Sequence, residues 1–183
     1  MRVTFLGTGT SHGVPMIGCG CAVCRSPDLR DRRWRPSILV TLGGGSRLLV
    51  DTATDLRAQA LAFGVDRIDA ILYTHGHADH ILGLDEVRPY NVLAGRALPA
   101  YADPATAADL RRTFAYVFAG DAGEGGGVPA IELHEISGPF ELYGETVCPV
   151  PIWHGRRQIL GFRLGRFAYL TDCSGIPEAS WPL

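Results

Sequence analysis

The sequence predicts one mixed α/β domain, assembled from short strands and helices. The chain has 183 residues, of which 46% are hydrophobic, so it can bury a sizeable core and is most simply a single domain over residues 1–183. Its 23 glycines and 12 prolines indicate many turns, which favours a β-rich or mixed fold over a helical bundle. Short apolar runs typical of strands recur along the chain and indicate the same class.

The first half of the chain alternates strands with helices. Residues 2–6 alternate as a half-buried strand does, and residues 37–42 and 47–50 flank three glycines, which predicts a β-hairpin. A helix is expected over about residues 54–63. Residues 68–74, IDAILYT, are a nearly continuous apolar run with aromatic and β-branched members, which predicts a buried strand.

The second half begins with a strand and a helix and then turns to strands. A strand is expected over residues 98–101, and a helix over residues 104–118, with Asp103 as its N-cap and Pro104 in its first turn. Residues 120–127, GDAGEGGG, predict an acidic, flexible loop. Strand patterns then follow at residues 131–136, 140–143, 146–153, 159–164 and 166–171.

Composition and charge exclude several classes of protein. The formal charge of −2 is too small to indicate a polyanion partner or a membrane surface. The N-terminus has no apolar core of signal-peptide length, and no segment approaches the roughly 20 apolar residues of a membrane span. A cytoplasmic location without a membrane partner is therefore expected. The five cysteines fit a reducing compartment better than a disulfide framework.

Three of the six histidines crowd into the loop that follows the buried strand, in the run HGHADH. A transition metal takes imidazole nitrogen and carboxylate oxygen at about 2.0–2.2 Å, so its ligands must converge. Alternate residues of an extended segment share a side, so His75 and His77 can hold one ion together. Asp79 and His80, after the chain bends, can reach a second ion nearby. The alternative is a polar surface loop in which these residues serve as capping groups.

Asp79 is also well placed to cap a short helix that begins near Ile81. The zincin motif HExxH is a poor match, because its histidines lie one helical turn apart and those of HGHADH alternate.

The HGHADH run resembles the HxHxDH signature of the metallo-β-lactamase fold, a superfamily of zinc-dependent hydrolases. Two further stretches resemble the branch of that superfamily that includes cyclic-phosphate phosphodiesterases. LGTGTSHGVPMIGCGCAVC is similar to its opening LGTGTSxGVPxxGCxCxxC, and GLDEVRPYN to its GLDxxRPxN run. The resemblance implies an α/β fold of αββα sandwich type. It covers almost the whole chain but only about three quarters of a complete fold, so the second half of the sandwich is expected to be incomplete.

The resemblance also assigns roles to residues outside the histidine-rich loop. His154, at the end of PVPIWHG, and Asp172, in FAYLTDCS, match the third and fourth ligand motifs. Asp51 matches an aspartate that orients the ligand loop without touching metal, and its alternative role is to cap the helix that follows it. The implied ligand set is His75, His77 and His154 for one ion, Asp79 and His80 for the other, and Asp172 as the bridge. Asp79 and Asp172 are the predicted catalytic residues.

The three clustered cysteines Cys19, Cys21 and Cys24 have a spacing that suits three thiolates around a tetrahedral zinc ion. In the phosphodiesterase branch a late histidine supplies the fourth ligand, and this chain ends before it. A structural zinc and ordinary reduced thiols are both open interpretations. His12, in the opening loop, is a minor candidate for a substrate contact.

Two zinc or manganese ions about 3.5–4 Å apart would lower the pKa of the water between them and neutralise the oxygens of a phosphodiester. No histidine follows His154, so the fifth ligand motif is absent. We therefore expect the first ion site to form, the second to bind weakly, and this chain, as a truncated product, to have little or no catalytic activity.

The leading functional hypothesis is a metal-dependent phosphodiesterase that acts on a small or cyclic phosphate ester. A ribonuclease acting on transfer-RNA 3′ ends is the second, and RNA is the less favoured substrate because the loop 120–127 is acidic. A mononuclear-iron oxidoreductase of the same fold is the third. A pyrroloquinoline quinone biosynthesis protein shares the CxCxxC opening but departs at the ligand loop. A homodimer is compatible with the sequence.

Overall fold

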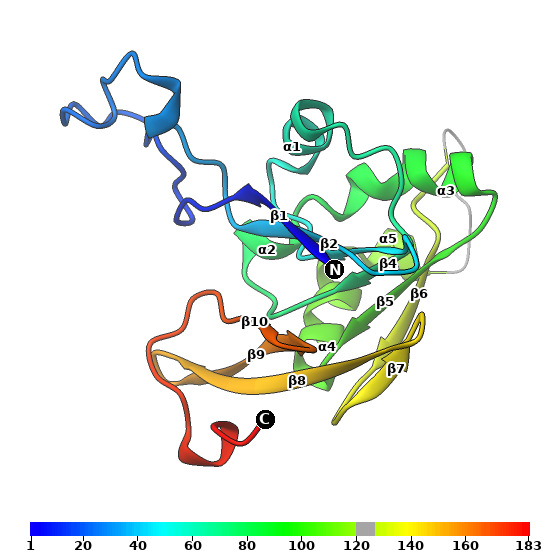
Figure 1. Ribbon diagram of the computed structural model, residues 1–183. Coiled ribbons are helices and arrows are strands. Elements are labelled where there is room, and N and C mark those ends of the chain that lie inside the picture. Colours follow the sequence, from blue (N-terminus) through cyan, green and yellow to red (C-terminus); the bar gives the residue numbers. More distant parts are fainter. Residues whose placement is uncertain (120–126) are drawn as a thin grey trace.

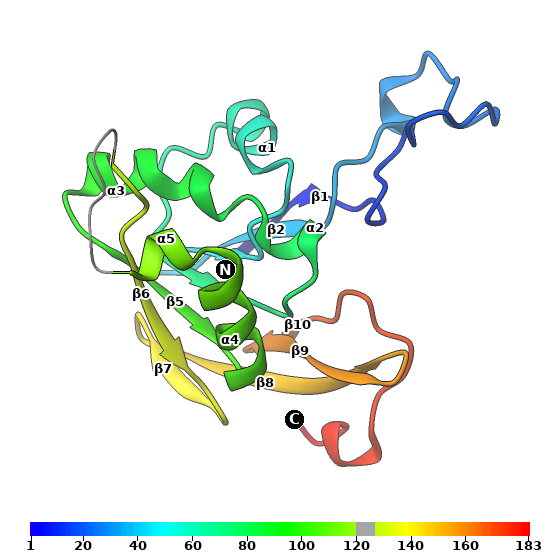
Figure 2. The same ribbon diagram turned by 180° about the vertical axis from the view of Figure 1, so that it is seen from behind.

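The computed structural model describes residues 1–119 and 127–183 and contains two β-sheets stacked face to face (Figure 1). The predicted loop at residues 120–127 therefore lies outside the described residues, apart from Gly127. Helices cover the outer face of the larger sheet, as the view from behind shows most clearly (Figure 2). Among the described residues, no helix combines the length and the apolar character needed to cross a membrane.

The larger sheet has six strands in chain order, antiparallel at its start and parallel at its end. The predicted hairpin is confirmed, because β2 and β3 pair antiparallel with Val40 opposite Leu48. The parallel half needs a crossover after each strand, which the helices and loops between them supply. The strands are β1 (Arg2–Gly7), β2 (Ser37–Thr41), β3 (Arg47–Val50), β4 (Ala70–Leu72), β5 (Leu98–Ala102) and β6 (Ile131–Glu135).

The helices are short, and one prediction about them needs correction. Asp103 caps α4 as predicted, since its carboxylate accepts a hydrogen bond from the Thr106 N–H at 2.7 Å. The single helix predicted over residues 104–118 is wrong, because the buried Phe114 leaves helical geometry and divides it into α4 and α5. The helices are α1 (Leu56–Phe63), α2 (Ala78–Ile81), α3 (Arg88–Ala94), α4 (Pro104–Thr113) and α5 (Ala115–Phe118), with 3-10 turns η1 (Leu29–Asp31), η2 (Leu84–Val87) and η3 (Glu178–Ser180).

The smaller sheet is antiparallel and has four strands in the order β10-β9-β8-β7. Its long central pair joins Ile152 to Ile159 and His154 to Arg157 across a tight turn. Four of the five strands predicted in the last third of the chain form this sheet, and the first of the five is β6 of the larger sheet. The four are β7 (Phe140–Leu142), β8 (Glu145–His154), β9 (Arg157–Leu164) and β10 (Phe167–Tyr169).

Two apolar layers hold the sheets and helices together. Ile71 of β4 belongs to the core beneath the helices, whereas its neighbour Leu72 belongs to the core between the sheets, with Phe162 of β9. Both faces of β4 are therefore buried, which explains its continuous apolar sequence. The αββ arrangement confirms the predicted sandwich. On the outer face of the smaller sheet, the Ser180 hydroxyl donates to the Pro151 carbonyl at 2.7 Å, so η3 covers part of that face.

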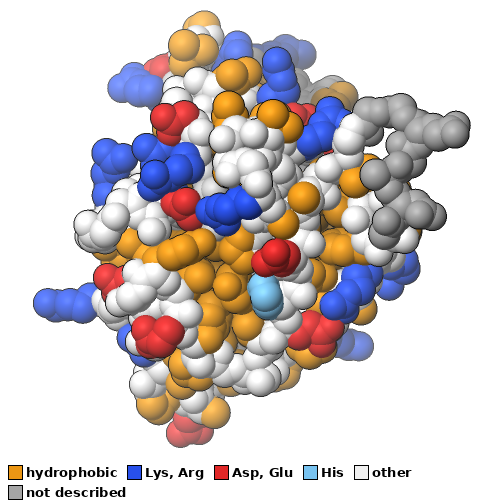
Figure 3. Space-filling view, turned by 90° about the vertical axis from the view of Figure 1, so that its right-hand side faces the viewer, with side chains coloured by type: hydrophobic (Ala, Val, Ile, Leu, Met, Phe, Trp, Pro, Cys, Tyr) orange, Lys and Arg blue, Asp and Glu red, His pale blue; other side chains and the backbone are white. Residues whose placement is uncertain are grey.

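The edge formed by β6 and β7 carries a group of stacked rings. Tyr101 lies between His134, with ring centroids 5.0 Å apart, and Phe140, with centroids 4.8 Å apart. Figure 3 faces this side of the molecule and shows hydrophobic side chains gathered there. His134 is exposed and lies two strands across the sheet from β4, so it is a surface residue and not a member of the histidine-rich cluster.

Candidate metal centre

Three segments that are distant in sequence meet at one end of the sandwich, near α2 and the ends of β8 and β10 (Figure 1). The loop after β4 supplies four of the predicted ligands, His154 ends β8, and Asp172 follows β10. The backbone joins the two sheets at this point, because the Leu160 N–H donates to the Thr74 carbonyl at 3.0 Å. The structure therefore brings together all six side chains that were predicted as metal ligands.

The first group contains His75, His77, His154 and Asp172, whose donor atoms all lie within 4.8 Å of one another. His75 Nε2 is 3.0 Å from His77 Nδ1, and Asp172 Oδ2 is 3.7 Å from His75 Nε2 and 3.8 Å from His154 Nε2. Ligands at about 2.1 Å from a tetrahedral ion lie about 3.4 Å from each other. The spacing of these four donors thus suits one ion at their centre.

The second group contains Asp79, His80 and Asp172. His80 Nε2 lies 3.5 Å from Asp79 Oδ2 and 3.4 Å from Asp172 Oδ2. The same Asp172 oxygen serves both groups, which is the arrangement of a bridging carboxylate. The predicted capping role of Asp79 is wrong, because α2 already begins at Ala78 and Asp79 lies in its first turn. Because α2 begins at Ala78, Asp79 and His80 both lie in its first turn, and both side chains approach Asp172.

One buried atom tests whether a cation fits here. His80 Nε2 is buried and has no hydrogen-bond partner among the described residues, although its other ring nitrogen, Nδ1, lies 2.7 Å from Asp51 Oδ2. A carboxylate can only accept, so Nδ1 carries a proton, and in the neutral imidazole it is Nε2 that presents the lone pair. A buried lone pair without a partner is costly, and a bound cation would satisfy it. The donor set therefore fits a divalent ion.

Asp51 controls the direction of both buried imidazoles. It accepts hydrogen bonds from the Thr74 N–H and the Thr74 hydroxyl, each at 2.8 Å, and from His80. Since the Thr74 hydroxyl proton goes to Asp51, its oxygen is free to accept from His75 Nδ1 at 3.0 Å. His75 and His80 consequently both turn Nε2 toward Asp172. The helix-capping alternative for Asp51 is wrong, because Asp55 stands at the N-cap of α1.

Charges and burial set the protonation of these groups in the absence of a metal ion. Burial lowers the pKa of His75 to about 3 and also lowers the pKa of His77, so both imidazoles are neutral. Burial opposes a charge on His80 too, but the carboxylates of Asp51, Asp172 and Asp79 raise its pKa to about 10. The adjacent His80 lowers the pKa of Asp172 to about 2. The carboxylates around His80 attract a proton when no metal is bound, and they would favour a divalent cation in the same place.

Two residues that no sequence pattern indicates support the ligand loop from behind. Asp109 of α4 binds Arg157 through Oδ2 at 2.9 Å, and Arg157 lies directly opposite His154 in the β8–β9 pair. Asp109 also packs against Gly76, between two of the ligands, where an added Cβ would lie 2.3 Å from Oδ2 and 2.6 Å from the Asp109 Cβ. Glycine at position 76 is therefore required for α4 to approach the loop.

Replacing Gly76 with alanine is expected to push the ligand loop away from α4. The new methyl group meets the base of the Asp109 side chain as well as its carboxylate, so rotation of the carboxylate is not enough and the backbone must move. We expect a loss of about 1–3 kcal/mol in the free energy of unfolding, together with weaker metal binding. Gly44→Ala is the matched control, since nothing lies within 4 Å of its added Cβ. Equal metal affinity and stability in the two variants would contradict the close contact.

A groove of about 710 Å³ opens over the two ligand groups. Its floor includes His77, Asp79, His154 and Asp172, so a bound ligand would reach both groups. Its volume lies in the range of about 300–1,000 Å³ that small-molecule sites occupy. The remaining lining residues are Phe5, Gly7, Thr8, Gly9, Thr10, Ser11, Pro36, Tyr169 and Thr171. His12 lines a different cavity.

The three cysteines form a separate cluster. The sulfur atoms of Cys19, Cys21 and Cys24 lie within 4.8 Å of one another, and the Cys24 N–H donates to the Cys21 sulfur at 3.4 Å. This hydrogen bond, with those to the neighbouring thiols, lowers the pKa of Cys21 to about 7. Thiolate character and spacing both suit zinc. Among the described residues, no fourth donor joins the cluster.

Known proteins are similar to this chain over most of its length. A family model described as the β-lactamase superfamily domain matches residues 46–183. A Porphyromonas gingivalis protein named octanoyltransferase is 43% identical over 178 residues, which cover 96% of this chain and 35% of that protein. The coenzyme PQQ synthesis protein B of Methylorubrum extorquens is 30% identical and covers 97% of this chain, which corresponds to 67% of that protein.

A solved structure also resembles the chain closely. The crystal structure of a diphosphatase from the PhnP family superposes with a TM-score of 0.86 at 49% identity and covers 97% of this chain and 68% of that one. The chain thus spans about two thirds of that structure, but only 35% of the P. gingivalis relative.

Proposed function

The chain belongs to the β-lactamase superfamily, and from this membership we propose that it is a metal-dependent hydrolase whose substrates are small or cyclic phosphodiesters. The observation that carries the proposal is the position of Asp172, whose Oδ2 lies between the two groups of imidazole and carboxylate donors. The similarity to a PhnP-family diphosphatase supports a phosphate substrate. The intact HGHADH run supports hydrolysis more than a role like that of the PQQ synthesis protein.

In this proposal each side chain has a defined task. His75, His77, His154 and Asp172 would hold one zinc or manganese ion, and Asp79, His80 and Asp172 the other. Two such ions supply an activated water at neutral pH and neutralise the charge of the phosphate oxygens. Asp51 keeps the Nε2 atoms of His75 and His80 available by fixing the proton on Nδ1.

The loop after β1 would position the substrate. Thr8, Thr10 and Ser11 line the groove opposite His154 and offer hydroxyl donors to phosphate oxygens. An in-line displacement at phosphorus needs such positioning, because the attacking and leaving oxygens must lie on opposite sides of the phosphorus atom. Asp79 and Asp172 are the catalytic residues of this proposal, since they touch the reacting centre through the ions.

A chromogenic phosphodiester assay tests the proposal. We expect slow hydrolysis of bis-(p-nitrophenyl) phosphate that requires added manganese or zinc and disappears with a chelator, since the second group has only three donors. Cleavage of a precursor transfer RNA without diester hydrolysis would instead favour the ribonuclease. Iron retained after aerobic purification, together with oxygen uptake, would favour the oxidoreductase and contradict the proposal.

The number of retained ions is a separate prediction. The first group offers four donors and the second offers three, one of them shared, so one ion per chain is expected to survive dialysis and the other to be lost. Elemental analysis before and after dialysis measures this. Two ions per chain that both survive would show that the second group is completed by a ligand that the donor set does not include.

A further inference from the structure

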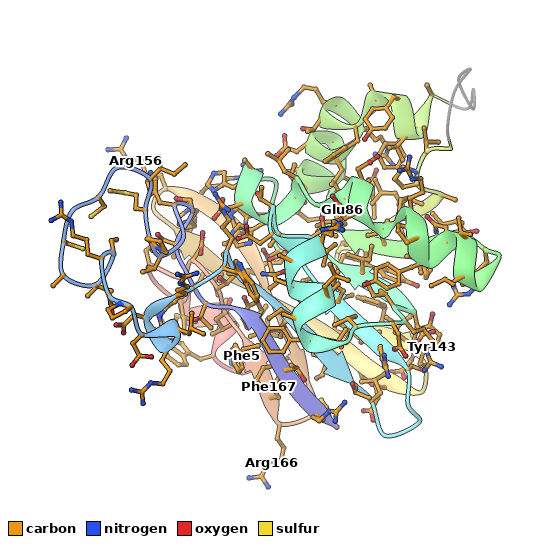
Figure 4. The ribbon with its side chains drawn as sticks, turned by 90° about the horizontal axis from the view of Figure 1, so that it is seen from above. Phe5, Glu86, Tyr143, Arg156, Arg166 and Phe167 are labelled. Carbon is orange, nitrogen blue, oxygen red and sulfur yellow. The ribbon has the colours of Figure 1, made fainter. Side chains whose placement is uncertain are left out.

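A second cavity, of about 560 Å³, lies beside the metal-centre groove where residues 8–36 return to the body of the protein. Figure 4 shows this segment, in blue, standing out at one side of the molecule. The loop after β1 separates the two hollows, since Thr8, Thr10 and Ser11 line the groove and His12 lines the cavity. None of the proposed metal ligands lines it. Its wall is formed by His12, Gly13, Val14, Pro15, Ile17, Leu29, Arg32, Arg33, Trp34, Arg35 and Asp55.

The wall of this cavity is held by backbone hydrogen bonds between two antiparallel stretches. The Val14 N–H donates to the Arg33 carbonyl at 2.9 Å, and the Arg33 N–H donates back to the Val14 carbonyl at 2.8 Å. The Gly9 N–H donates to the Trp34 carbonyl at 2.7 Å, and a Cβ at Gly9 would lie 2.9 Å from both the Arg33 and the Trp34 oxygens. The stretches are therefore locked together, and the cavity is preformed.

The charge on the wall is positive. Asp55 is the one carboxylate in the lining, and it is already paired with Arg35, with Nη1 to Oδ1 at 2.7 Å and the Arg35 N–H to Oδ2 at 2.9 Å. Arg33 donates through Nη1 to the Thr8 hydroxyl at 3.1 Å. Neither Arg32 nor Arg33 forms an ion pair with a described residue. Two guanidinium groups thus remain to bind an anion, and their planar donors match phosphate oxygens.

The same wall carries an aromatic surface. The Trp34 indole is 38% exposed and is held from one side by an edge contact with Phe63 of α1, with centroids 6.3 Å apart. Apolar side chains of Val14, Pro15 and Leu29 adjoin it. An aromatic ring beside two guanidinium groups suits a ligand that has both a planar aromatic part and a phosphate. The cavity volume, about 560 Å³, admits a ligand of that size.

We propose that this cavity is a binding site for a nucleoside monophosphate, with the phosphate on Arg32 and Arg33 and the base against Trp34. The site uses none of the residues of the proposed hydrolytic centre and requires no metal. It lies next to the groove, across the loop that carries Thr8 and His12, so an occupant would lie close to the substrate of the neighbouring centre.

Calorimetric titration of the protein with adenosine 5′-monophosphate in the presence of a chelator tests the proposal. The chelator removes metal-dependent binding at the neighbouring groove, so failure here leaves the hydrolase proposal intact. We expect one site per chain with millimolar or tighter affinity, and quenching of tryptophan fluorescence. The double variant Arg32→Gln/Arg33→Gln should weaken binding about tenfold or more, as expected for the loss of charge-assisted hydrogen bonds.

Two further variants separate the parts of the site. Trp34→Leu should weaken binding of the nucleotide at least about fivefold while leaving the affinity for inorganic phosphate unchanged. Arg30→Ala is the matched control, because Arg30 is paired with Asp28 and lies outside the cavity. Circular dichroism should show all variants folded. The proposal is overturned if the nucleotide does not saturate below about 10 mM, if adenosine binds as well as its phosphate, or if Arg30→Ala weakens binding equally.

Discussion

Replacing Asp172 with asparagine is expected to abolish metal retention and hydrolysis together. One oxygen of this carboxylate lies 3.4 Å from His80 Nε2, 3.7 Å from His75 Nε2 and 3.8 Å from His154 Nε2. An amide at this position carries no charge and cannot bridge two cations. We expect hydrolysis to fall at least about 10³-fold, roughly 4 kcal/mol of transition-state stabilisation, and neither ion to survive dialysis.

Asparagine is the suitable replacement because the backbone at position 172 has φ of 55°. Asparagine tolerates this left-handed conformation, so the fold should persist and the loss can be attributed to the carboxylate. Asp103→Asn is the matched control, since asparagine caps a helix as well as aspartate does. If Asp172→Asn kept the ion that survives dialysis in the unaltered protein, together with full activity, the two donor groups would not share this residue and the proposed centre would fail.

The ligand loop could be predicted from sequence because its information is local. His75 and His77 alternate in an extended segment directly after a strand whose two faces are both buried, so their direction follows from the period of the strand. His154 and Asp172 came from the resemblance to a family. Each ends or follows a strand, and periodicity alone could not place them beside a loop more than 70 residues earlier.

Other features of the site depend on contacts that no local pattern encodes. Asp51 and Asp172 both have positive φ, a strain that only the assembled site supports. Asp109 and Arg157 meet because α4 crosses behind the ligand loop, and neither has a motif around it. The start of α2 at Ala78 also has no local signal, because His77 takes the N-cap position without making a side-chain capping bond. A search for glycines beside a ligand run would have pointed to Gly76.

The alanine and asparagine variants of Asp51 are expected to fail in different ways. Asp51 is fully buried and accepts hydrogen bonds from the Thr74 N–H, the Thr74 hydroxyl and His80 Nδ1. Asp51→Ala leaves these three donors without a partner inside the protein. We expect a loss of about 3–5 kcal/mol in the free energy of unfolding, which denaturant titration measures.

Asp51→Asn preserves the shape and the left-handed backbone, with φ of 62°, but reverses two hydrogen bonds. If the amide oxygen accepts from the Thr74 N–H, the amide nitrogen faces both the Thr74 hydroxyl and His80 Nδ1 and must donate to them. The imidazole proton then moves to Nε2, and the nitrogen that should bind metal becomes a donor. The variant is expected to remain folded but, with the proton on Nε2, to bind metal about 10–100-fold more weakly, as measured by competition with a chelator.

Asp69→Asn separates this effect from the loss of a carboxylate beside β4. Asp69 accepts a hydrogen bond from the Arg47 N–H at 2.8 Å and lies at the opposite end of β4 from Thr74. Its replacement should leave metal affinity unchanged. Metal affinity that falls equally in Asp51→Asn and Asp69→Asn would mean that general loosening of β4 is responsible. A selective loss in Asp51→Asn, at near-native stability, requires that Asp51 sets the tautomers of His75 and His80, because no other change in the variant reaches their Nε2 atoms.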